Sequence, residues 1–202
     1  MGAQTLKSGR LSAEERREQL LDATKAIVSR DGFHAVSIEA VAREAGVSRP
    51  IVYGHFNDLP GLLEALVDRE GARALGQLAE VLPRDLQSGD PRENLLAGLR
   101  GYLAAAETDP VTWRLVLMPP EGAPDVLRER VASGRAAVLA QLAETVRPGI
   151  GALVSPDPEL TARMLSTLAD EAVRLVLADS EHYTPERVVT HARWALGLLG
   201  AT

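Results

Sequence analysis

The feature that most constrains the fold of this chain is a helix-start signal that recurs along its 202 residues. At four of the starts a residue whose side chain can cap a helix is followed directly by proline. Proline has no amide hydrogen, and in the first turn of a helix that hydrogen would have no helical partner. A fifth start has the spacing of a capping box, in which a serine and a glutamate satisfy each other's amide groups. These starts are Ser12 with Glu15, Asp90-Pro91, Asp109-Pro110, Asp157-Pro158 and Thr184-Pro185.

Each start predicts a helix, and two further helices fit in the stretches between them. Signals for β-strands are missing, because aromatic residues make up 3% of the chain and it has no alternating β-branched runs and no Asn-Gly turn. Together with two short helices described below, we predict an all-α chain of about nine helices. The longer ones are expected near residues 12–31, 59–82, 91–107, 110–118, 124–147, 158–179 and 185–199.

Composition argues against several classes of protein. The chain has no cysteine, which removes disulfides, thiolate zinc sites and cysteine nucleophiles together. It has no apolar run long enough for a transmembrane helix, and its first ten residues lack the apolar core of a secretory signal. It also lacks the Gly-x-Ser-x-Gly, phosphate-loop and His-Glu-x-x-His motifs, and its four histidines are scattered. We therefore expect a cytoplasmic protein that is not an enzyme, contacts no membrane and holds no metal ion or cofactor.

The formal net charge is −6, but it is unevenly spread along the chain. Up to Phe56 there are eight Lys or Arg residues against seven Asp or Glu, so this part is slightly basic and the remainder is acidic. Attraction to DNA depends on the local field, so a basic head on an acidic body would turn the head towards phosphates. Solvated surface groups explain most of these charges equally well.

Residues 37–56, with the sequence SIEAVAREAGVSRPIVYGHF, carry the functional signal. Apolar residues at i, i+3, i+4 and i+7 predict a short helix with one apolar face, capped by Ser37 and ended by Gly46. Ser48 then caps a second short helix with an apolar pair at i, i+4. Two short helices joined by a tight turn form a helix-turn-helix, whose second helix enters the major groove of DNA. The apolar positions are Ile38, Val41, Ala42 and Ala45 in the first helix and Val52 and Phe56 in the second.

At these residues the sequence resembles the TetR family of bacterial repressors, over roughly Ala13 to Leu66. Single dipeptides would carry no weight, but several motifs occur together in one register. They are the helix end Arg30-Asp31-Gly32-Phe33, then Ser37-Ile38-x-x-Val41-Ala42, Ala45-Gly46-Val47-Ser48 and Tyr53-x-His55-Phe56.

The resemblance implies a dimeric transcriptional regulator, a repressor that a small-molecule effector of unknown identity releases from its operator. The operator would be palindromic double-stranded DNA, because a twofold dimer reads two half-sites. The resemblance also implies two domains. They are an N-terminal three-helix helix-turn-helix DNA-binding domain at residues 10–56, and a larger helical effector-binding and dimerisation domain at residues 57–202.

The resemblance also assigns residues to DNA. Two serines would hold phosphates with their hydroxyls and the exposed amides of a helix N-terminus. Arg49 would donate two hydrogen bonds to a guanine, and Ile51 would pack on a thymine methyl group. Members often carry a lysine where this chain has Leu59. One fewer phosphate is then neutralised and the log-log salt slope flattens by about 0.9, unless Lys7 or Arg10 supplies the contact instead. The expected DNA-binding residues are Ser37 and Ser48 at phosphates, Arg49, Pro50, Ile51 and Gly54 in the groove, and Tyr53 and His55 at the sugar-phosphate backbone.

The last two expected helices are apolar around much of their circumference, so one face can serve the core and another a partner. In the resembling family the equivalent pair forms a four-helix bundle with a second copy, so we expect a homodimer through these helices. A monomeric core would explain the same pattern. The middle helices would line an effector pocket, although a tryptophan or methionine there is more often plain core. The expected pocket residues are Leu99, Tyr102, Leu103, Trp113, Leu117, Met118, Met164 and Glu171.

If the mechanism follows the family, effector binding would shift the helix near 59–82 and change the separation of the two recognition helices. This requires the effector to bind the DNA-incompetent state more tightly. The alternative is a helix-turn-helix DNA-binding protein whose C-terminal body docks a protein partner and senses no small ligand. A filled core without a sizeable cavity would favour that alternative.

Overall fold

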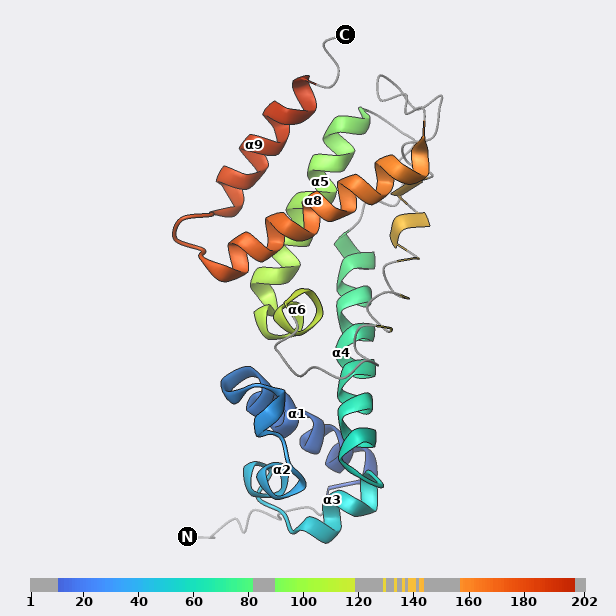
Figure 1. Ribbon diagram of the computed structural model, residues 1–202, viewed down its shortest axis with the longest axis vertical. Coiled ribbons are helices and arrows are strands. Elements are labelled where there is room, and N and C mark those ends of the chain that lie inside the picture. The colour runs from blue at the N-terminus through green and yellow to red at the C-terminus, as the bar shows by residue number, and fades with distance from the viewer. Residues whose placement is uncertain are drawn as a thin grey trace, which may run out of the picture. The chain divides into compact units, whose positions relative to one another are not determined.

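The structure, a computed structural model, describes residues 11–81, 90–118 and 157–198 together with scattered positions from 129 to 143. In these residues every regular element is a helix, which confirms the all-α prediction (Figure 1). The chain divides into two compact units, Met1–Leu66 (unit 1) and Val67–Thr202 (unit 2). The functions predicted for residues 10–56 and 57–202 are not tested by this division and stay predictions.

The described helices begin at or next to the predicted starts. The helix predicted near 124–147 lies largely outside the described residues, and the positions described there are helical. The described elements are α1 (Ala13–Asp31), the 3-10 turn η1 (Phe33–Ala35), α2 (Ile38–Glu44), α3 (Arg49–His55), α4 (Leu59–Val81), α5 (Pro91–Thr108), α6 (Pro110–Leu117), α8 (Pro158–Ala178) and α9 (Pro185–Leu198).

The five caps predicted at the starts of the longer helices are all present. At the start of α1 the Ser12 amide donates to Glu15 Oε2 at 2.7 Å, and the Glu15 amide donates to Ser12 Oγ at 3.2 Å. Hydrogen bonding of the Glu15 carboxylate to Ser12, first to its backbone amide and then to its side chain, lowers the pKa of Glu15 below its ordinary value. In the other four cases the capping oxygen accepts from an amide in the first turn, as such caps do. The pairs are Asp90 with Arg92, Asp109 with Thr112, Asp157 with Leu160 and Thr184 with Arg187.

In unit 1, α1 packs against both α2 and α3. The centre of this packing is apolar, with Leu20, Val41 and Val52 fully buried. Gly32 ends α1 with a φ of 84°, and its amide donates to the Val28 carbonyl at 2.9 Å. A φ in this range favours glycine, which has no Cβ to strain the backbone. The chain therefore turns sharply after α1 and can place α2 and α3 against it.

In unit 2, α5 is the central helix, because α6, α8 and α9 all contact it (Figure 1). Leu96, Leu103 and Ala106 of α5 are buried in the apolar core, which α8 and α9 complete. The end of α4 also approaches α5 closely at Gly101. A Cβ on that glycine would lie 2.9 Å from the Val81 carbonyl oxygen, so only glycine fits at this contact.

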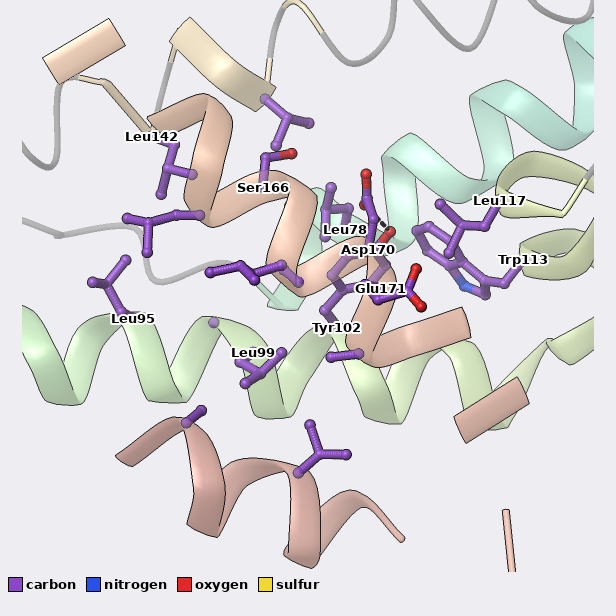
Figure 2. Close-up of a pocket in the computed structure, with 18 of the residues that line it drawn as sticks. Leu78, Leu95, Leu99, Tyr102, Trp113, Leu117, Leu142, Ser166, Asp170 and Glu171 are labelled. Carbon is purple, nitrogen blue, oxygen red and sulfur yellow. Dashed lines mark hydrogen bonds between the residues drawn. The ribbon is translucent and has the colours of Figure 1, made fainter. Parts of the chain in front are cut away.

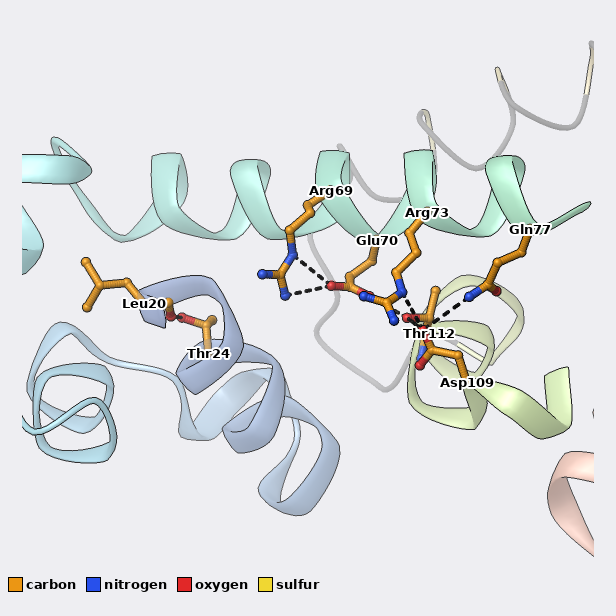
Figure 3. Close-up of polar contacts among 8 residues, drawn as sticks. All are labelled: Leu20, Thr24, Arg69, Glu70, Arg73, Gln77, Asp109 and Thr112. Carbon is orange, nitrogen blue, oxygen red and sulfur yellow. Dashed lines mark hydrogen bonds and ion pairs between the residues drawn. The ribbon is translucent and has the colours of Figure 1, made fainter. Parts of the chain in front are cut away.

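A buried carboxylate joins α4 to α6 inside unit 2 (Figure 3). Glu70 of α4 has 2% of its side chain exposed, and its Oε1 lies 2.7 Å from Arg69 Nη2. Its other carboxylate oxygen accepts a hydrogen bond from the Thr112 hydroxyl of α6. A buried charge is tolerated only when it is paired and hydrogen-bonded, and these contacts supply both conditions.

The same region carries a second set of polar contacts between α4 and the start of α6. Asp109, the cap of α6, accepts from Arg73 Nε at 2.6 Å and lies 3.4 Å from Gln77 Nε2. Gln77 in turn accepts at 2.8 Å from the indole nitrogen of Trp113. These contacts hold Trp113 in one orientation, and that side chain lines the cavity described below.

Replacing Thr112 by valine should destabilise unit 2. Thr112→Val keeps the shape of the side chain but removes the hydroxyl that contacts the buried Glu70 carboxylate and Asp109 Oδ2. Leaving a buried charged group with an unmade hydrogen bond costs about 1–3 kcal/mol. We expect the free energy of unfolding, measured by urea denaturation followed by circular dichroism, to fall by about that amount.

The matched control is Thr108→Val. Thr108 is exposed, and its hydroxyl donates only to a carbonyl of its own helix, Ala104, at 2.9 Å. A surface change of this kind should stay within about 0.5 kcal/mol of wild type. Equal losses in the two variants would contradict a stabilising role for the Glu70 contact.

Candidate functional site

The turn between α2 and α3 is closed by two backbone hydrogen bonds. The Gly46 amide donates to the Arg43 carbonyl at 3.2 Å, and the Val47 amide donates to the Ala42 carbonyl at 2.9 Å. This is the Schellman arrangement, which needs a left-handed residue at its centre. Gly46 supplies it with a φ of 67°. No atom lies within 4 Å of a Cβ built there, so the backbone angle and not lack of space selects glycine.

The short helix α3 separates its residues into a buried and an exposed set. Val52 and Phe56 are buried, as their i, i+4 spacing predicts. The residues of α3 that are predicted to meet DNA remain accessible. Arg49, Pro50, Ile51, Tyr53 and Gly54 are exposed, and His55 is half-buried.

The two predicted caps of these helices differ. Ser37 caps α2 as expected, with its Oγ accepting from the Ala40 amide at 3.1 Å. Ser48 occupies the capping position of α3, but its side chain makes no capping hydrogen bond, so that detail of the prediction is wrong. The reason is local: Pro50 has no amide to donate, and the Ile51 amide already donates to the Ser48 carbonyl at 3.0 Å. The Ser48 hydroxyl therefore stays at the exposed start of α3.

Side chains of α1 brace the ends of both short helices, a feature that sequence analysis missed. The Arg17 guanidinium lies 4.5 Å from the centre of the Phe56 ring and donates to the His55 carbonyl at 3.4 Å. Gln19 Nε2 donates to the Ala45 carbonyl, at the end of α2, at 3.2 Å. A cation near the last carbonyls of a helix is favourable, and a cation over an aromatic ring adds to it. No periodicity in the sequence points to these contacts.

The basic residue predicted to contact a guanine is held in an ion pair. Arg49 Nη1 lies 2.5 Å from Glu39 Oε1, and both side chains are largely exposed. The hydrogen bond between them lowers the pKa of Glu39 and raises the pKa of Arg49. Both groups therefore remain charged at neutral pH. Sequence analysis also missed this contact, because the two residues lie on different helices.

Unit 2 contains a cavity of about 1410 Å³, lined by residues of α4, α5, α6, α8 and α9. Most of its lining is apolar, and Figure 2 shows leucine side chains along its length. Two of its lining residues, Leu168 and Trp194, are strongly exposed. The cavity is therefore open at the side of α8 and α9. Its size and lining are those of a site for a small apolar or amphipathic molecule.

Five of the eight predicted pocket residues line this cavity, and three do not. The lining includes Leu99, Tyr102, Trp113, Leu117 and Glu171. Leu103 follows Tyr102 on α5 but points into the core, where it is buried. Met118 is an exposed residue at the end of α6, and Met164 lies on the exposed face of α8. A methionine among apolar positions therefore did not predict a residue of the cavity wall.

Two carboxylates of the cavity lie toward one of its ends. The carboxylates of Asp170 and Glu171 lie near Trp113 and Leu117, far from Leu95 and Leu142 (Figure 2). The Tyr102 hydroxyl donates to Asp170 Oδ1 at 2.9 Å, and the rings of Tyr102 and Trp113 are tilted against each other at 4.9 Å. Asp170 is buried and was not among the predicted residues.

Neither a metal site nor a membrane-spanning helix is found in the described part of the chain. Among those residues there is no group of three or more His, Cys, Asp or Glu side chains placed to hold a metal ion. None of the described helices combines the length and the apolar character needed to cross a bilayer.

Comparison with known proteins points to one family. Residues 20–66 match the family model described as bacterial regulatory proteins, tetR family. The HTH-type transcriptional regulator BetI of Yersinia pestis is 42% identical over 86 residues, which is 43% of this chain and 43% of that protein. The matched part thus spans less than half the length of that relative. BetI of Serratia proteamaculans is 31% identical over 158 residues, 77% of each chain.

Solved structures share the fold over nearly the whole chain. A TetR-like transcriptional regulator from Rhodococcus sp. RHA1 aligns with a TM-score of 0.74 and 25% identity, covering 95% of this chain and all of that one. The transcriptional regulator FadR of Bacillus subtilis, in complex with stearoyl-CoA, aligns with a TM-score of 0.66 and 18% identity. That alignment covers 91% of this chain and 97% of FadR. At such identity the likeness to FadR is one of fold alone.

Proposed function

The chain belongs to the TetR family of bacterial regulatory proteins, and from this premise we propose that it is a transcriptional repressor that binds a palindromic DNA operator. The observation that carries the proposal is the partition of α3. Val52 within α3 and Phe56 directly after it are buried in unit 1, and the other residues of the helix, from Arg49 on, are exposed or half-buried. A helix held in this way can enter the major groove with its N-terminal residues at base edges. The function is binding and not catalysis, and its place of action is the cytoplasm, where a bacterial chromosome lies.

We propose the same DNA-binding residues as the sequence predicts. Arg49 would contact guanine, with Pro50, Ile51 and Gly54 beside it in the groove. Their shared exposure supports this assignment. Tyr53 and His55 would reach the sugar-phosphate backbone. The Ser48 hydroxyl, which makes no capping bond, can donate to a phosphate without giving up a helix contact.

We further propose that a small-molecule effector binds in the cavity of unit 2 and releases the operator. The cavity supports this reading over the alternative of a body that docks a protein partner and senses no ligand, because that alternative needs no space of about 1410 Å³. Release requires the effector to bind the DNA-incompetent state more tightly than the DNA-bound state. The effector would have a large apolar part, to match the leucine-rich lining.

We also propose that the protein is a homodimer through α8 and α9. Three large apolar residues follow one another at i, i+4 and i+8 on α8, so they form one exposed stripe. Leu160, Met164 and Leu168 have 53%, 59% and 67% of their surface exposed. Trp194 of α9 is exposed as well. An apolar stripe of this kind on a helix marks a contact surface, and a twofold partner would cover it and match a palindromic operator.

The DNA-binding proposal is tested by selection from sheared genomic DNA. Purified protein is incubated with the fragments, and the bound ones are sequenced. Enrichment of a palindromic site is expected for wild type. Arg49→Ala should bind that site about 10- to 100-fold more weakly, because a bidentate arginine–guanine contact is lost. Arg30→Ala is the control, since Arg30 is an exposed arginine of α1 that pairs with Asp31 and Glu44. No enriched palindrome for wild type at low salt would sink the proposal.

The effector proposal is tested by filling the cavity. Leu99→Trp places a larger side chain on its wall, and we expect it to weaken binding of the apolar dye Nile red at least about tenfold, as overfilled apolar sites do. Operator affinity should stay within about twofold of wild type. Thr108→Trp, at an exposed position of the same helix, should leave dye binding unchanged. Undiminished dye binding by Leu99→Trp would show that the cavity is not the ligand site.

The dimer proposal is tested by placing a charge on the exposed stripe. Leu168→Glu would bury two unpaired carboxylates at the interface, so we expect the dimer dissociation constant to rise at least about 100-fold. Sedimentation equilibrium measures it. Thr108→Glu places the same charge at an exposed position of α5, outside this stripe, and should leave the dimer intact. A wild-type protein that sediments as a monomer at every concentration would contradict the proposal directly.

A further inference from the structure

The contact between Glu39 and Arg49 joins the exposed starts of the two short helices. Glu39 is the second residue of α2, and Arg49 is the first residue of α3. Their side chains are 56% and 62% exposed, and Arg49 Nη1 lies 2.5 Å from Glu39 Oε1. Exposed ion pairs contribute little to folding stability, so the fold of unit 1 gives no reason for this pair.

The charges of the pair are stable at neutral pH. The hydrogen bond to Arg49 lowers the pKa of Glu39, and the hydrogen bond to Glu39 raises the pKa of Arg49. A negative charge thus stands beside the arginine that we propose for reading DNA. A carboxylate at a surface that must approach phosphates weakens binding by repulsion. Its presence there is explained if it improves the discrimination between DNA sequences.

We infer that Glu39 determines specificity by holding Arg49 in position for a guanine and away from phosphates. This inference rests on the proposed DNA-binding function and adds a residue that acts through another one. Glu39 is therefore a positioning residue, and its effect should appear in the ratio of specific to non-specific affinity.

The chemistry of the guanidinium allows both contacts at once. It carries five N–H donors, and the carboxylate occupies donors on Nη1 only. The remaining donors can form the paired hydrogen bonds to O6 and N7 of guanine. An arginine already fixed by Glu39 also loses less side-chain freedom when it binds the base.

Away from the correct base pair the same carboxylate opposes binding. A free arginine can swing to a phosphate on any sequence, and each neutralised phosphate adds about 0.9 to the log-log salt slope. Glu39 competes with the phosphate for the guanidinium and repels the backbone. It should therefore weaken binding to unrelated DNA more than binding to the operator.

A rival explanation is that Glu39 is one of many surface charges. It would then weaken binding to all sequences alike, with or without Arg49. Glu44 provides the matched control, because it is an exposed glutamate at the other end of α2 that pairs with Arg30 at 3.2 Å. Replacing either glutamate by glutamine removes the same charge from the same helix.

The experiment uses the full-length protein with Glu39→Gln and Glu44→Gln, each alone and combined with Arg49→Ala. Fluorescence anisotropy gives affinities for three duplexes. They are the selected operator, an unrelated duplex, and the operator changed at one base pair. That base pair is the one that wild type distinguishes and Arg49→Ala does not. Each affinity is measured from 50 to 200 mM salt. Thermal melts check that the variants fold, which their exposed positions favour.

We expect Glu39→Gln to bind the unrelated duplex about fivefold more tightly, with a salt slope steeper by about 0.9, because the released arginine gains a phosphate. Operator affinity should stay within about twofold, so discrimination at that base pair falls. In the Arg49→Ala background, Glu39→Gln and Glu44→Gln should change the affinities and the salt slopes by the same amount.

Two results would overturn the inference in different ways. The first result is that, with Arg49 present, Glu39→Gln and Glu44→Gln change the affinities for all three duplexes by the same factor. Glu39 is then an ordinary surface charge, and the DNA-binding proposal stands. If the wild-type protein binds no duplex even at 50 mM salt, the DNA-binding proposal itself fails and the inference falls with it.

Discussion

Every helix in this protein depends on satisfying the amide groups of its first turn. Most helices meet this need with a side chain that directly precedes them, as at Ser12 and Asp90. Because such caps are local, they set where a helix begins before distant contacts form. The starting point then decides which residues face inward. On α2, which Ser37 caps, Val41 and Ala42 then face the core.

Local signals therefore predict the helices well, and long-range partners poorly. The positions of the caps, the turn at Gly46 and the buried pair on α3 all follow from spacing within a few residues. Arg17 beneath Phe56 and the Thr112 contact to Glu70 join residues 39 and 42 positions apart on different helices. Nothing in the periodicity of either helix indicates its partner.

The predicted cavity residues illustrate the same limit on a finer scale. Helical periodicity tells which residues are apolar but not whether they face core, cavity or solvent. Tyr102 and Leu103 are neighbours on α5, yet only Tyr102 lines the cavity. Met164 was expected inside and lies outside. Asp170 looks like a surface residue in the sequence, but it is buried, and the Tyr102 hydroxyl donates a hydrogen bond to it.

The composition of α3 has a consequence for how this surface can be imitated. The helix has seven residues, RPIVYGH, and almost all of them are weak helix formers. Its shape is maintained by the two buried side chains and by Arg17 at its end, not by its own preference. A free peptide this short would be a coil in water. Synthetic copies of the recognition segment would therefore need covalent stapling, or grafting onto a folded scaffold, before they could compete for the same DNA.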